Sequence, residues 1–210
     1  MTLTQVTIVF QVIVFLFAIS VHESAHAWMA WKRGDPTARM LGRVTLNPIK
    51  HIDPIGTVLL PIICIATGLP AFGWAKPTPV NPRNFQRPVM DDILTSLAGP
   101  VSNFLLVTVA AVVLTVLFRL PASAAGTVEP LVAFFGAGLV INLVLGIFNL
   151  VPVPPLDGSH VFRHLLPERA QRVYDTIGML GLVVLFLFAG RILGPIINTL
   201  MHYILAIIGS

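Results

Sequence analysis

Hydrophobic residues form long stretches along this chain, and polar residues gather in the segments between them. Residues 6–31, 93–120 and 131–151 are each long enough for a helix that crosses a bilayer core about 30 Å thick. Residues 176–189 and 192–208 are also apolar, and they form either two further spans or one hairpin. We therefore predict an all-α polytopic membrane protein with about five to six membrane segments.

The region after the first predicted span is interrupted by polar residues, glycine and proline. Weak alternation within residues 34–53 is typical of short strands, so a small β-hairpin and a plain surface loop are equally favoured there. The edge of such a hairpin would bind an extended substrate by strand addition. Residues 55–72 are apolar but contain several helix breakers: Gly56, Pro61, Gly68 and Pro70. We predict that this segment re-enters the membrane without crossing it, as irregular backbone is tolerated where protein or a water-filled cavity covers it.

Composition supports a membrane protein and argues against a nucleic-acid-binding one. Hydrophobic residues make up 56% of the 210 residues and charged residues only 10%, against about a quarter charged in soluble domains. A net charge of +4 does not by itself indicate nucleic-acid binding, and the sequence contains no RNA- or DNA-binding motif. Lysine and arginine are instead typical of cytoplasmic loops. The single cysteine, Cys64, excludes an intramolecular disulfide.

The distribution of basic residues tests the predicted topology. With residues 55–72 re-entrant, only Arg119 and Arg191 lie outside, and the other eleven basic residues face the cytoplasm. A full crossing by residues 55–72 would place three more basic residues outside. It would also place Asp157 on the opposite face of the membrane from His22 and His26, which are the candidate metal ligands described below. Both considerations favour the re-entrant topology.

An H-E-x-x-H motif lies at the end of the first apolar stretch, at His22, Glu23 and His26. Residues four apart share one face of a helix, so both histidines can bind one metal ion, and Glu23 can act as a base. Ionisable residues inside a membrane are expensive and are functional by default. The alternative is a structural pair of core histidines. His160 and His164 share the spacing without the glutamate, and we interpret them as surface residues.

Asp157 is the candidate for a third metal ligand, because a catalytic zinc has three protein ligands and one open position. It lies in the sequence NLVPVPPLDG, residues 149–158, and is the only acidic residue between Glu129 and Glu168. The prolines end the preceding helix, and Gly158 permits a turn. Alone, this pattern favours a turn with Asp157 as the N-cap of the next helix. Beside the H-E-x-x-H motif, a metal ligand is favoured.

Together these motifs resemble the site-2 protease family of intramembrane zinc metalloproteases. The resemblance rests on H-E-x-x-H in a membrane helix, on the later NxxPxPPLDG and on GPVSN at residues 99–103. It extends from about residue 6 to about residue 160 and is closest to short members without PDZ or CBS domains. It implies one membrane-embedded metalloprotease domain over residues 1–210, with a β-hairpin near the active site.

The resemblance also implies a cofactor and a reaction. One zinc ion per chain would be held by His22, His26 and Asp157, with Glu23 as the general base. The substrates would be transmembrane segments of other proteins, and the site would open to the cytoplasmic side of the cell membrane. The alternatives are a non-hydrolytic membrane metal-binding protein or transporter, and a structural protein that retains only the fold. Glu23 argues against a transporter, which needs no acid directly after the first histidine.

Two asparagines are expected to be further polar groups of the active site. Asn149 could hydrogen-bond the substrate backbone or a developing oxyanion. Asn103 must find a polar partner inside the membrane, so we expect it to face the site in the same capacity. For Gly99 and Ser102, which lie near it, a role in helix packing and a role in the site are equally favoured.

Overall fold

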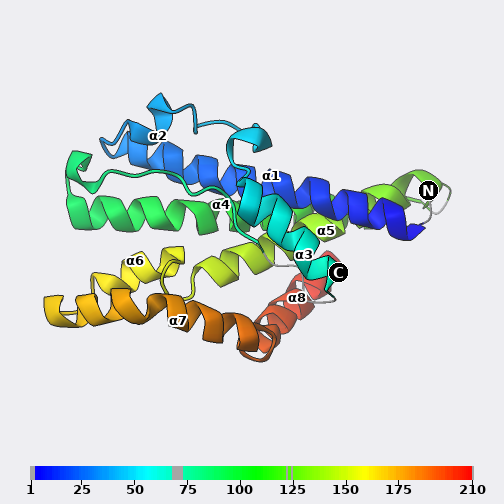
Figure 1. Ribbon diagram of the computed structural model, residues 1–210. Coiled ribbons are helices and arrows are strands. Elements are labelled where there is room, and N and C mark those ends of the chain that lie inside the picture. The colour runs from blue at the N-terminus through cyan, green and yellow to red at the C-terminus, as the bar shows by residue number, and fades with distance from the viewer. Residues whose placement is uncertain (1–2, 68–72, 122, 124, 210) are drawn as a thin grey trace.

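A computed structural model describes residues 3–67, 73–121, 123 and 125–209, and all regular structure in these ranges is helical (Figure 1). Three of the described helices are long and apolar enough to cross a membrane. They are α1 (Leu3–Lys32), α4 (Pro88–Phe118) and α5 (Ala125–Asn149). These helices coincide with the three clear spans predicted from the sequence, so the all-α membrane fold is confirmed.

The three long helices pack against one another, and α8 (Gly194–Ile208) completes their core. The core joins α4, α5 and α8 through buried apolar side chains such as Leu114, Leu139 and Ile208. Large apolar side chains also cover the outer faces, where Leu105 is 63% exposed and Val112 is 60% exposed. An apolar surface of this kind is unfavourable in water and suits a surrounding of lipid.

The predicted count of five to six membrane segments is not supported. After α5, the chain forms α7 (Glu168–Ile192) and α8, and neither is a candidate span among the described residues. Helix α7 begins with a charged stretch, and α8 has only 15 residues. Their apolar parts are thus shorter than the roughly 20 residues that a spanning helix needs.

Residues 34–53 contain no β-hairpin, so of the two alternatives that the sequence favoured equally the hairpin was wrong. They form α2 (Thr37–Met40), the short 3-10 helix η1 (Pro48–Lys50) and turns. Arg43, which is 5% exposed, connects this region to the later loop by binding backbone carbonyl groups. Its guanidinium donates hydrogen bonds to the carbonyl oxygens of Lys50, Lys76 and Pro77.

The apolar segment that follows turns back on itself. It contains the π-helical η2 (Pro54–Leu59) and α3 (Leu60–Ala66). The Trp74 N–H donates to the Gly56 carbonyl at 3.1 Å, so the chain returns beside its starting point, as a re-entrant segment requires. A Cβ on Gly56 would lie 2.4 Å from the Trp74 indole, so only glycine allows this close approach. Residues 68–72 of the predicted segment lie outside the described residues.

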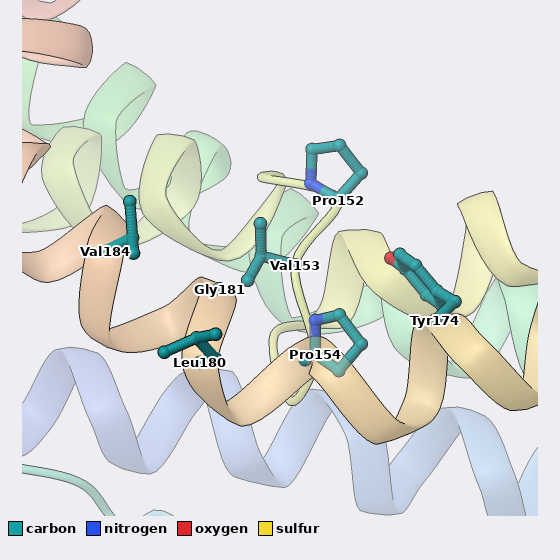
Figure 2. Close-up of a pocket in the computed structure, with 8 residues that line it drawn as sticks. Pro152, Val153, Pro154, Tyr174, Leu180, Gly181 and Val184 are labelled. Carbon is teal, nitrogen blue, oxygen red and sulfur yellow. The ribbon is translucent and has the colours of Figure 1, made fainter.

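The chain between α5 and α7 forms a proline-rich turn and the short helix α6 (Asp157–Arg163). The turn rests on α7, where a Cβ added to Gly178 would come within 2.4 Å of the Pro154 Cβ. Beside this contact lies an apolar groove of about 360 Å³ between the turn and α7 (Figure 2). Tyr174 lies at one end of the labelled residues and Val184 at the other. The turn thus fixes where α6 begins.

Candidate metal centre and active site

Three side chains that are distant in the sequence converge on one point. The His22 and His26 Nε2 atoms are 3.0 Å apart, and the Asp157 Oδ2 atom lies 3.2 Å and 3.3 Å from them. Ligands about 2.0–2.1 Å from a tetrahedral zinc ion are about 3.3 Å from one another. This triangle therefore fits one face of a zinc tetrahedron, and the fourth corner is left for water or substrate. It is the only such cluster among the described residues.

Asp157 faces the histidines and does not cap the helix. It is the first residue of α6, whereas Leu156 occupies the N-cap position without a side-chain hydrogen bond. The Asp157 Oδ2 atom is buried and has no hydrogen-bond partner, so it fits the role of a metal ligand. Of the two interpretations of this residue, the geometry fits the metal ligand.

The second nitrogen of each histidine ring is already engaged. The His26 Nδ1 atom donates to the Thr95 carbonyl oxygen at 2.7 Å, and the His22 Nδ1 atom lies 2.6 Å from Asn103 Oδ1. A hydrogen bond at Nδ1 leaves the lone pair on Nε2 and fixes the ring, as is usual for metal-binding histidines. Both rings are therefore oriented with Nε2 toward Asp157.

Gly99 forms the wall of the centre on the α4 side. A Cβ at this position would lie 2.3 Å from His26 Nε2 and 2.6 Å from His22 Nε2. Real Cβ atoms do not approach other atoms so closely, so any larger residue would fill the space between the histidines. Gly99 is required for the metal site, beyond the helix packing that the sequence also suggested.

Gly158 is likewise needed for the position of Asp157. A Cβ there would lie 2.2 Å from the Leu150 carbonyl oxygen. The absence of a side chain lets the start of α6 fold back against the end of α5. Asp157 reaches the histidines because of this contact.

Glu23 projects toward an extended segment that runs past the site. Its Oε2 atom accepts hydrogen bonds from the Thr78 N–H at 2.9 Å and from the Thr78 hydroxyl at 2.8 Å. The same segment is held at Asn81, whose N–H donates to the buried Asp35 carboxylate. Hydrogen bonds from Thr37 and Asn84 help to keep the pKa of Asp35 low, against burial, which raises it. Glu23 is thus placed beside the centre without occupying a ligand position.

The two predicted asparagines have different surroundings. Asn103 is fully buried, and its side chain is engaged at both ends, by His22 and by Asn142. That arrangement fits the orientation of His22 rather than contact with a substrate. Asn149 ends α5, and its amide nitrogen donates to the Leu145 carbonyl at 3.0 Å. The structure does not connect Asn149 to the three ligands.

His160 and His164, interpreted from the sequence as surface residues, are only partly so. Both bind Asp92 of α4, with His164 Nε2 at 2.8 Å and His160 Nδ1 at 3.3 Å from its carboxylate. The His160 side chain is 48% exposed and that of His164 is 17% exposed. These contacts fasten α6, and therefore Asp157, to α4.

Three contributors were not recognised from the sequence. Thr78 contacts Glu23, Asn142 contacts Asn103, and the Thr95 carbonyl holds His26. Asn142 carried a signal, because a buried amide in an apolar helix needs a partner. Thr78 carried none, since its place depends on the path of a loop.

Comparison with known proteins agrees with this geometry. Residues 120–189, which include Asp157, match peptidase family M50. The chain is 39% identical over 197 residues to a Bacillus subtilis protein named "Putative zinc metalloprotease YwhC", covering 89% of this chain and 85% of that protein. It is also similar to proteins named "Putative zinc metalloprotease Rip2". The identity is 35% in Mycolicibacterium smegmatis and 30% in Mycobacterium tuberculosis strain H37Rv, covering 82% of this chain and 64% of each relative. No solved structure gives a significant match.

Proposed function

The chain belongs to peptidase family M50 and is a zinc metalloprotease, and we propose that it hydrolyses peptide bonds within or near transmembrane segments of other membrane proteins. One observation carries this proposal. The ligand atoms of His22, His26 and Asp157 converge on one point. The two histidines lie on α1, which is apolar enough to cross a membrane, and Asp157 lies beside them. A site at that depth reaches substrates embedded in the bilayer.

The chain's own residues divide the chemistry among them. Zinc, held by His22, His26 and Asp157, supplies Lewis acidity toward the scissile carbonyl and promotes the ionisation of water. Glu23 accepts the proton of the attacking water and delivers it to the leaving amine. Thr78 donates two hydrogen bonds to Glu23 Oε2, which directs that carboxylate and leaves Oε1 for the water. The pairing of an acid with two histidines favours hydrolysis over the transporter alternative.

Substrate access follows from the same arrangement. A helical substrate satisfies its own backbone hydrogen bonds, so it must unwind before its carbonyl can reach the centre. Asn149, at the end of α5 near the turn that leads to Asp157, is the proposed partner for the exposed backbone or the oxyanion. The many basic residues outside the three candidate spans support an opening of the site at the cytoplasmic face of the cell membrane, since such loops are rich in lysine and arginine.

A paired measurement on Glu23→Gln tests the proposal. Glutamine keeps the size of the side chain but cannot take a proton, so cleavage of a model membrane substrate should fall by about 10²–10⁴-fold. Zinc content should stay near one ion per chain, because Glu23 is not a ligand. Glu129→Gln is the matched control, since Glu129 is exposed on α5 and should leave both quantities unchanged. Wild-type cleavage by Glu23→Gln would overturn the assignment of the base.

A further inference from the structure

A chain of hydrogen bonds connects the backbone of α5 to the metal-binding face of α1. The Asn142 amide nitrogen donates to the Gly138 carbonyl oxygen at 2.8 Å. The Asn103 amide nitrogen donates to Asn142 Oδ1 at 2.9 Å, and Asn103 Oδ1 lies 2.6 Å from His22 Nδ1. All three side chains are buried, with 0%, 4% and 7% exposure for Asn103, Asn142 and His22. Water therefore cannot substitute for these partners.

The direction of this chain is fixed at its far end. A backbone carbonyl only accepts hydrogen bonds, so Asn142 must turn its NH₂ group toward Gly138 and its oxygen toward Asn103. Asn103 must then give its own NH₂ group to Asn142 and its oxygen to His22. An oxygen at that place requires a proton on His22 Nδ1, and the lone pair then lies on Nε2.

His26 needs no such relay. Its Nδ1 atom donates directly to a backbone carbonyl, that of Thr95, which cannot change its role. The partner of His22 is instead a side-chain amide, which could rotate and present its NH₂ group. That rotated state would favour the tautomer with the proton on Nε2, and this tautomer cannot bind a metal through Nε2.

We propose that Asn142 is a positioning residue for the metal centre: it fixes the orientation of the Asn103 amide and so keeps His22 in the metal-binding tautomer. This inference rests on the ligand role of His22 in the proposed function. It assigns to α5 a part in metal binding although α5 carries none of the three ligands. Asn142 acts through Asn103 and not on the substrate.

Zinc affinity of the full-length protein, measured in detergent by competition with a chromophoric chelator, tests the proposal. Asn142→Leu removes the acceptor for Asn103 and should weaken zinc binding by about 10–100-fold, as for other partners of metal ligands. Thr115→Val is the matched control. It removes a partly buried hydroxyl from α4 that bonds only the Ala111 carbonyl, and it should bind zinc as the wild type does.

A second substitution separates orientation from packing. In the double variant Asn142→Leu/Asn103→Asp, a carboxylate faces His22, and a carboxylate has no NH₂ group to present in the wrong direction. Zinc affinity should therefore recover most of the loss seen in Asn142→Leu. If Asn142 served only to fill space, the double variant would bind zinc no better than the single one, and that result would overturn the proposal.

Nitrogen chemical shifts of labelled histidine in the metal-free wild type report the tautomer of His22 directly, with His22→Gln used only to assign its signals. We expect the proton of His22 on Nδ1, and a proton on Nε2 would contradict the proposal. Wild-type zinc affinity in Asn142→Leu would also overturn it, while the proposed function stands. A wild-type protein that binds no zinc would instead overturn the proposed function itself.

Discussion

The two sides of the metal centre hold their ligands by different means. On the histidine side, α1, α4 and α5 pack along their lengths, and each histidine has a buried partner at Nδ1. On the aspartate side, Asp157 follows a proline-rich turn and is held by the close approach of Gly158 to Leu150 and by the bonds from α6 to Asp92. The first side is a packed helix bundle, and the second is a short helix fastened at a few points.

This difference separates two requirements of the site. Four-residue spacing on one helix brings the two histidines together without help from the rest of the fold. The third ligand has no local reason to be there and depends on contacts between distant segments. Damage to the histidine side should remove two ligands at once, whereas damage to the aspartate side should remove one.

The largest effect is expected for Gly99→Ala. The added Cβ would lie 2.3 Å from His26 Nε2, and neither ring can move away without breaking its bond to Asn103 or Thr95. Zinc affinity should fall by at least about 100-fold, and cleavage should fall with it. Gly136→Ala, with nothing within 4 Å of the added Cβ, is the control and should bind zinc normally. Normal zinc binding by Gly99→Ala would show that the histidine side is not rigid.

A smaller loss is expected for Gly158→Ala. The added Cβ would meet the backbone of Leu150 at 2.2 Å, so the start of α6 and Asp157 must move. The two histidines stay in place, and zinc affinity should fall by roughly 10–100-fold in chelator competition. Gly190→Ala in α7, where nothing lies within 4 Å, should have no such effect. An equal loss in Gly99→Ala and Gly158→Ala would remove the distinction between the two sides.

A still smaller effect should follow from loosening α6. Asp92→Asn removes the charge that His164 and His160 bind, and we expect cleavage to fall severalfold, up to about tenfold. Asp175→Asn breaks an exposed ion pair between α7 and Arg163 of α6 and is the control, since such pairs contribute little. If both variants cleave at the same rate, the bonds to Asp92 do not hold the aspartate side.

The smallest effect is a dependence on pH. The hydrogen bond with Asp92 raises the pKa of His160 above 6.5, although burial lowers it and the charges of Asp92 and Asp157 add to the rise. A raised pKa stabilises the fold fully below about pH 6.5, and this contribution is lost as pH rises through the folded-state value. Because His160 is half exposed, the gain should be below about 1 kcal/mol.

Thermal unfolding in detergent at about pH 6 and about pH 9 measures this contribution. The wild type should lose slightly more stability on the rise in pH than His160→Gln, which keeps a polar side chain but does not titrate in this range. Equal losses in the two proteins would show that His160 does not contribute.

The long helices and the pair of histidines could be predicted because each has a local signature. Apolar length defines α1, α4 and α5, and the spacing of His22 and His26 needs only one helix. Asp157 was identified as a candidate because an acid beside helix-breaking prolines is rare in an apolar chain. Apolar length and four-residue spacing do not depend on contacts with the rest of the fold.

The remainder depends on contacts between distant segments, which no local pattern encodes. Residues 34–53 alternate weakly, as strands do, but they form short helices and turns, and the buried Arg43 binds backbone carbonyls both within and beyond this region. Asn103 was expected to face the site, where it contacts His22, but its second partner, Asn142 of α5, carried no local signal for this pairing. The count of five to six membrane segments is not supported, because the apolar parts of α7 and α8 are shorter than a bilayer requires.

The separation of the ligands along the chain also sets an order of events during synthesis. Asp157 follows His26 by about 130 residues. At about 5–20 residues per second, the histidines are made of order ten seconds before their third partner exists. Asn103 and Thr95 are translated well before Asp157, so both rings can find hydrogen-bond partners first. The nascent protein can thus orient its histidines early and complete its metal site only after Asp157 has been made.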